Sequence, residues 1–191
     1  NIWVAMFILA PLVVGLIGLI VEWVLIRFLY GRMVDTLLAT WGLSLLFIGL
    51  ITTIFGAQTA TTISPPFGPI PIGEFSSSGY EVFLIFVAII LILLLYLLLR
   101  YTKLGLVARG TMQTADMAAA LGISTQRVYS MTFGIGAALS GLAGGLLAPI
   151  TGVLPTIGAI YIGKAFITVI SGGTAILAGT AAASILLGGV N

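Results

Sequence analysis

The sequence predicts an all-α fold, a polytopic bundle of transmembrane helices. Of its 191 residues, 60% are hydrophobic and only 6% are charged, whereas an ordinary soluble domain has roughly 45–50% apolar and about 25% charged residues. Uncharged apolar runs also recur at about the 20-residue length that a helix needs to cross the hydrocarbon core of a bilayer. A longer polar segment between two of these runs predicts a short helix outside the membrane.

Five runs qualify as spans of a single transmembrane domain, at about residues 2–26, 36–55, 82–99, 128–150 and 165–190. The first run continues past Glu22. The fifth is interrupted by glycines, which favours a broken or re-entrant helix. The chain begins with Asn1 rather than Met and stops just after an apolar stretch, so we expect it to lack spans at both ends.

Basic residues set the expected orientation of these spans. Arg27 and Arg32 lie between the first and second runs, and four further basic residues lie in 100–127, between the third and fourth. The positive-inside rule makes both connections cytoplasmic. Segment 57–80 has no Lys or Arg and is rich in Pro, Gly, Ser and Thr, which predicts an ordered periplasmic loop. It is either a solvated connector or a surface that meets an external partner.

Small residues recur at intervals of four in the fourth and fifth runs, as in helices that approach each other closely in a membrane. These rows predict helix packing at Ala137, Gly141, Gly145, Ala175, Gly179 and Ala183. Such packing is equally compatible with a role in transport and with a purely structural one.

A polar row at the same interval marks the second run, where Thr36, Thr40 and Ser44 follow one another. The row either lines a hydrated path or consists of hydroxyl groups that each bond the carbonyl one turn back, as membrane Ser and Thr often do.

The cytoplasmic segment 103–127 is too polar to be a span and contains helix signals. Thr114 is a candidate N-cap, Asp116 falls in the first turn, and Gly122 suits the C′ position that ends a helix. This helix of about two turns carries Met117, Ala120 and Leu121 on one face. Because isolated helices shorter than about 12–15 residues are marginal in water, we expect that face to dock on a soluble partner, or else on the membrane domain or lipid interface.

Composition also excludes several functions. The chain has no Cys and no His, its net charge is only +2, and it contains no GxxxxGK[ST] sequence. We therefore expect no catalytic residue, no metal or other cofactor, no nucleic-acid partner and no ATP site within this chain.

The string from Met117 to Ile123, MAAALGI, resembles the EAA loop of ABC-importer permeases in the form typical of branched-chain amino-acid (Liv-type) permeases. Its surroundings are similar to that family in the same order, from the Arg100–Gly105 string to Lys164-Ala-Phe and the pair Gly172-Gly173. The resemblance is strongest from Arg100 to Gly179.

The resemblance implies a permease in a bacterial or archaeal cytoplasmic membrane that works with a second permease subunit, two cytoplasmic ATP-binding subunits and a periplasmic substrate-binding protein. It implies ATP-driven alternating access, with hydrolysis in the partner subunits. Hydrophobic amino acids are the leading substrate, and urea or short amides are the alternative. A channel or ion-coupled carrier is a further alternative, but such proteins commonly place ionisable groups inside their spans.

Two sets of residues carry these expectations. The ATPase-coupling set is Thr114, Asp116, Met117, Ala120, Leu121, Gly122 and Ile123. The candidate pathway set is Thr36, Thr40, Ser44, Lys164, Thr168, Gly172 and Gly173. Lys164, expected just before the fifth span, either anchors that span by reaching lipid phosphates or attracts the carboxylate of an amino acid.

Overall fold

The computed structural model describes residues 2–56, 69–72, 75–172 and 184. Within that part of the chain, four helical stretches are long and apolar enough to cross a membrane: Ala5–Phe28, Val34–Phe55, Gly79–Tyr101 and Thr125–Thr151. The all-α polytopic class predicted from the sequence is confirmed, and the chain is a multi-pass membrane protein.

The elements follow one another as α1 (Ile2–Val4), η1 (Ala5–Leu9), α2 (Ala10–Val24), η2 (Ile26–Phe28), α3 (Met33–Phe55), β1 (Pro69–Ile72), β2 (Phe75–Ser78), α4 (Gly79–Tyr101), α5 (Lys103–Gln113), α6 (Ala115–Ala120), α7 (Thr125–Thr151) and α8 (Ile157–Gly172). The first span is one continuous helical path in which η1 is a π-helical turn and η2 a 3-10 turn. The π-helical turn lies just before Pro11, which has no N–H to continue the regular hydrogen-bond ladder.

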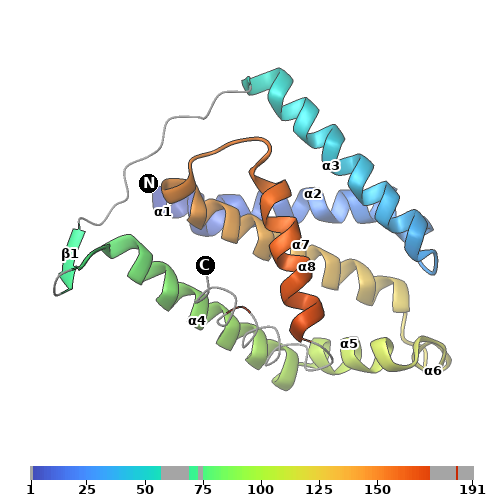
Figure 1. Ribbon diagram of the computed structural model, residues 1–191. Coiled ribbons are helices and arrows are strands. Elements are labelled where there is room, and N and C mark those ends of the chain that lie inside the picture. Colours follow the sequence, from blue (N-terminus) through green and yellow to red (C-terminus); the bar gives the residue numbers. More distant parts are fainter. Residues whose placement is uncertain (1, 57–68, 73–74, 173–183, 185–191) are drawn as a thin grey trace.

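The core is the contact between α2 and α7, which run side by side (Figure 1). Gly18 of α2 faces Ala137, and Gly141 of α7 faces Val14 so closely that an added Cβ would lie 2.6 Å from the Cβ of Val14. Gly145 packs on the same helix one turn further along. The small residues on α7 therefore leave room for α2, including the side chain of Val14 at Gly141, and the two backbones approach closely.

The two ends of this pair carry different elements. At one end the Tyr80 hydroxyl, in the first turn of α4, donates to the carbonyl oxygen of Leu146 at 2.8 Å, and Tyr80 is fully buried. The antiparallel hairpin β1–β2 lies at that end, with Pro69 opposite Ser78. The α2–α3 turn and α6 lie at the opposite end (Figure 1).

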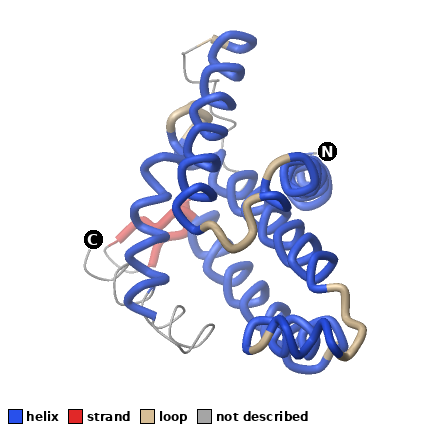
Figure 2. Tube along the Cα trace, turned by 90° about the vertical axis from the view of Figure 1, so that its right-hand side faces the viewer, coloured by secondary structure: helices blue, strands red, loops and turns tan. Residues whose placement is uncertain are grey.

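Helix α3 diverges from the α2–α7 pair in Figure 1, whereas α8 crosses in front of α7 there and is separated from it in the view turned by 90° (Figures 1 and 2). None of the residues in the apolar window of α3 is buried, and along α8 large side chains such as Ile160 and Ile170 are 65% and 75% exposed. In a bilayer these apolar surfaces meet hydrocarbon or other protein.

The prediction that a helix begins after Lys164 is wrong, because α8 begins at Ile157, shortly after Pro155. Lys164 therefore lies in the middle of a helix. The single charge does not end the helix, since its long apolar stem can follow the helix surface and carry the ammonium group away from it. The continuation of the predicted fifth span beyond Gly172, with Ala175, Gly179 and Ala183, lies outside the described residues.

Candidate functional site

Helix α6 is held at the end of the bundle by its neighbours in the chain. Ala118 is buried at 6% exposure, and α6 lies between the end of α5 and the start of α7. Helix α5 was not predicted as a separate element. It begins at the cap residue Thr102, whose hydroxyl accepts a hydrogen bond from the Gly105 N–H at 3.2 Å. Thus the polar segment forms two short helices rather than one.

The ends of α6 are defined by its backbone. Thr114 has the extended conformation of an N-cap, although its side chain makes no capping hydrogen bond to α6. Its N–H also ends α5, by donating to the Gly110 carbonyl at 3.2 Å. Gly122 occupies the predicted C′ position with φ +82°. Its N–H donates to the Ala119 carbonyl, and the N–H of Ile123 donates to the Ala118 carbonyl, which is the Schellman arrangement.

The opposite face of α6 is open. Met117 is 63% exposed and Leu121 is 77% exposed, while Asp116 and Ala120 beside them are also exposed. Ile123, after the glycine, is half-buried. Met117 on the six-residue helix α6 and Leu121 at its C-cap thus form a compact apolar contact surface that no described part of this chain covers.

The candidate pathway residues of α3 bond to their own backbone. The Thr36 hydroxyl donates to the Arg32 carbonyl at 2.8 Å and lies 3.0 Å from the Leu29 carbonyl. The Thr40 hydroxyl donates to the Thr36 carbonyl at 2.9 Å. These are the turn-back bonds that the sequence left as one of two alternatives. Ser44 is half-buried on the same row.

The candidate pathway residues of α8 lie on an exposed helix. Lys164 is exposed, and the hydroxyl of Thr168 donates to the Lys164 carbonyl at 2.8 Å. Gly172 is the last residue of α8, and Gly173 lies outside the described residues. The structure does not bring Lys164 and the threonines of α3 into one site.

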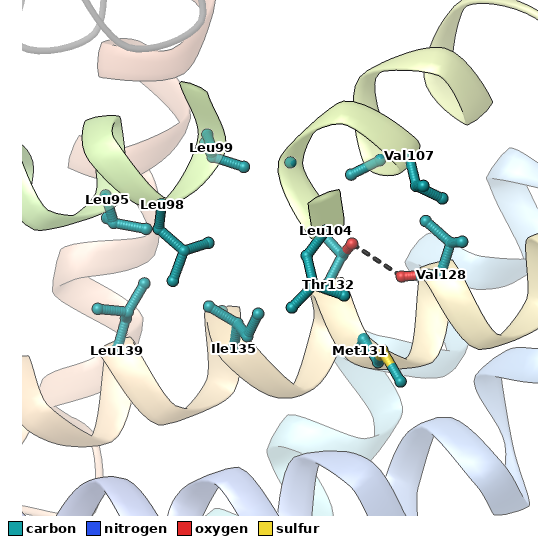
Figure 3. A pocket seen from close by; sticks show the side chains of 13 residues that line it. Leu95, Leu98, Leu99, Leu104, Val107, Val128, Met131, Thr132, Ile135 and Leu139 are labelled. Atoms are coloured by element: carbon teal, nitrogen blue, oxygen red, sulfur yellow. Dashed lines mark hydrogen bonds between the residues drawn. The ribbon is translucent and has the colours of Figure 1, made fainter. Parts of the chain in front are cut away.

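An apolar cavity of about 210 Å³ lies where α4, α5 and α7 meet. Leu98, Leu104, Ile135 and Leu139 point into it (Figure 3). The one hydroxyl in its wall, on Thr132, donates to the Val128 carbonyl at 2.8 Å. Because its lining offers so little to a polar solute, this cavity is not a site for a charged or zwitterionic ligand.

Sequence reasoning missed a polar contact at the end of α2. Glu22 is only 2% exposed, and its Oε1 accepts a hydrogen bond of 2.9 Å from the Tyr30 hydroxyl. A second cavity, of about 250 Å³, lies beside Glu22 and is also lined by Arg27 and Arg127. The available signal was an acid inside an apolar run. The composition of the run alone presents Glu22 only as a residue that the first span passes. Among the described residues, no acidic cluster could hold a metal ion.

A family described as the permease component of branched-chain amino acid transport systems matches residues 1–191 of this chain. The matching curated relatives carry permease descriptions as well. LivH of Escherichia coli (strain K12), a high-affinity branched-chain amino acid transport system permease protein, is 37% identical over 103 residues, which cover 53% of this chain and 33% of the relative.

Two further relatives extend this comparison. A probable branched-chain amino acid transport permease protein LivH of Methanocaldococcus jannaschii is 28% identical over 159 residues, covering 80% of this chain and 50% of the relative. BraD of Pseudomonas aeruginosa is 35% identical over 122 residues, covering 61% of this chain and 40% of the relative. These matches thus span between a third and a half of the relatives' lengths. No solved structure matches the chain.

Proposed function

The chain belongs to the family of branched-chain amino acid transport permease components, and on that premise we propose that it is the membrane subunit of an ABC importer that moves branched-chain or other hydrophobic amino acids into the cytoplasm. It works in a bacterial or archaeal cytoplasmic membrane. Its partners are a second permease subunit, two cytoplasmic ATP-binding subunits and a periplasmic substrate-binding protein.

The observation that carries this proposal is the open face of α6. Met117 and Leu121 are 63% and 77% exposed, and each contributes roughly 1.5–3 kcal/mol when it is moved from water into an apolar groove. An ATP-binding subunit supplies that groove, and Asp116 lies beside it at the polar rim. The remaining coupling residues, Thr114, Ala120, Gly122 and Ile123, set the length and exit direction of the helix.

Coupling then proceeds from α6 into the spans. Gly122 ends α6 and α7 begins at Thr125, so a displacement of α6 moves the first turn of α7 directly. The close contact of α7 with α2 makes these two helices move as a unit, because a closely packed interface leaves little free volume in which side chains could rearrange. Closure of the ATP-binding subunits thereby alternates access to a central pathway.

Lys164 is the residue of this chain that we assign to attract the substrate's carboxylate, with Thr168 one turn away. A zwitterionic amino acid gains from an ammonium group near its carboxylate, whereas neutral urea gains little. The polar row Thr36, Thr40 and Ser44, and the glycines Gly172 and Gly173, complete the proposed pathway. In that role Thr36 and Thr40 act as hydrogen-bond acceptors, since their protons are donated to the backbone.

Co-purification tests this proposal. The full-length protein that contains this chain, purified in mild detergent with the ATP-binding subunit expressed beside it, is expected to retain that subunit, and Leu121→Asp is expected to lose it. Recovery of the full-length parent protein without any ATP-binding subunit, together with ATP-independent uptake, would instead identify a channel or carrier.

A further inference from the structure

Glu22 is a buried acid within the first span. It lies in the stretch Ala5–Phe28, which is otherwise uncharged up to Arg27, and its side chain is 2% exposed. Ionisable residues in membrane helices are costly, face protein rather than lipid, and usually serve function together with an identifiable partner. The requirements of span formation alone do not account for a buried carboxylate at this position.

The partner of Glu22 is Tyr30, in the turn that joins α2 to α3. The Tyr30 hydroxyl donates to Glu22 Oε1 at 2.9 Å, and the next residue, Gly31, has φ +89°, which allows the chain to reverse. Burial raises the pKa of the Tyr30 hydroxyl, and the bond to the Glu22 carboxylate raises it further. Tyr30 therefore remains a donor at physiological pH, and the bond fastens the turn to the end of α2.

Among the described residues, no arginine forms an ion pair with Glu22. Arg27 and Arg127 line the neighbouring cavity, but the one ion pair among the described residues joins Arg32 to Asp35 at 3.6 Å. The guanidinium of Arg27 instead lies over the Phe28 ring, 5.1 Å from its centroid. The hydroxyl of Tyr30 is thus the group that holds the Glu22 carboxylate.

The same turn contacts both α7 and α3. The ring of Tyr30 lies 4.9 Å, centroid to centroid, from the ring of Tyr129 in the second turn of α7. On its other side, the Leu29 carbonyl oxygen lies 3.0 Å from the Thr36 hydroxyl in α3. Because no residue in the apolar window of α3 is buried, these turn contacts govern how α3 is placed relative to the core of the described chain.

We propose that Glu22 is a positioning residue for transport: through Tyr30 it locks the α2–α3 turn against Tyr129, so that movement of α6 and the start of α7 is passed to α3. The inference rests on the proposed function. In this account, the movement that starts at α6 reaches α3 through one buried hydrogen bond, between Tyr30 and Glu22. Removing that bond leaves α6 able to bind its ATP-binding subunit and stimulate hydrolysis, but α3 no longer follows.

The test compares three single variants in the complete transporter, reconstituted in liposomes. Glu22→Gln keeps an oxygen acceptor for Tyr30 and removes the charge, Glu22→Leu removes the acceptor, and Tyr30→Phe removes the donor. Tyr101→Phe is the matched control, because it deletes the hydroxyl of a tyrosine that is 74% exposed. The readout is the number of solute molecules transported per ATP hydrolysed, measured beside the thermal stability of each purified variant.

We expect Glu22→Leu and Tyr30→Phe each to lower this ratio at least about fivefold, the lower end of typical coupling between sites, while Glu22→Gln and Tyr101→Phe stay near the parent. The double variant Glu22→Leu/Tyr30→Phe is expected to be no worse than either single variant. Parental ratios in both disrupting variants, or a Glu22→Gln loss as large as that of Glu22→Leu, would overturn the inference.

A second measurement separates this inference from the proposed function. If the parent transports nothing with ATP, the proposed function fails. A thermal-unfolding cycle on the parent, Glu22→Leu, Tyr30→Phe and the double variant then still tests the contact between Glu22 and Tyr30. Non-additive destabilisation supports the Glu22–Tyr30 contact, because residues that share one bond lose it only once. Additive effects show that the two side chains act separately, and the positioning role is then excluded.

Discussion

Replacing Gly141 with alanine tests the close approach of α2 and α7. A Cβ at this position would lie 2.6 Å from the Cβ of Val14 and 2.8 Å from the carbonyl oxygen of Ala10. Because that oxygen belongs to the backbone, no rotamer change relieves the overlap, and the two helices have to separate. Overpacking of this kind costs typically about 1–3 kcal/mol, against a gain of roughly 0.5–1 kcal/mol when alanine replaces glycine inside a helix. The net result is a destabilisation of up to about 2.5 kcal/mol.

Gly144→Ala is the matched control for this substitution. It lies on the same helix and gains the same helix propensity, but nothing lies within 4 Å of its added Cβ. In the full-length protein held in lipid nanodiscs, thermal unfolding followed by tryptophan fluorescence should show a lower midpoint for Gly141→Ala and an unchanged or higher one for Gly144→Ala. Equal midpoints for the two variants would refute the packing argument.

Three further predictions concern coupling, substrate and topology. Leu121→Asp should leave membrane insertion intact and uncouple ATP hydrolysis from uptake, because an unpaired carboxylate desolvated in the docking groove costs several kcal/mol; parental uptake would show that α6 is not the docking helix. Lys164→Gln should lower amino-acid uptake at least about tenfold, equivalent to roughly 1.4 kcal/mol, with expression and assembly retained, whereas unchanged uptake would make Lys164 a lipid anchor. Single cysteines at Ser77 and Thr125, in this Cys-free chain, should react with an impermeant thiol reagent from opposite sides of the membrane, and labelling of both from one side would contradict the proposed orientation.

The helices of the bundle could be predicted because uncharged runs of sufficient length have few alternatives in lipid. Their boundaries could not all be predicted from charge. The expectation that a span excludes a lysine placed the start of the fifth helix after Lys164, whereas α8 begins after Pro155. A lysine inside a helix is tolerated because its long stem can carry the ammonium group outward.

Single residues and their spacing also predicted part of the candidate site and of the helix packing. The glycine at 122 predicted the end of α6 because a C′ residue needs the left-handed backbone that it has. The small residues Gly141 and Gly145 predicted close packing, but not that the partner would be α2 with its own Gly18, because spacing within one helix does not identify the helix it faces. The Glu22–Tyr30 bond joins residues on either side of an irregular turn, where no helix or strand period relates them.

The central claim, that this chain is the membrane subunit of an ATP-driven importer for hydrophobic amino acids, is tested most directly by uptake into liposomes. The complete transporter, with its ATP-binding subunits and its substrate-binding protein, is supplied with labelled leucine or labelled urea, with and without ATP. We expect leucine to accumulate only when ATP is present, and urea not to accumulate. Accumulation of urea alone, or leucine entry that does not depend on ATP, would contradict the account.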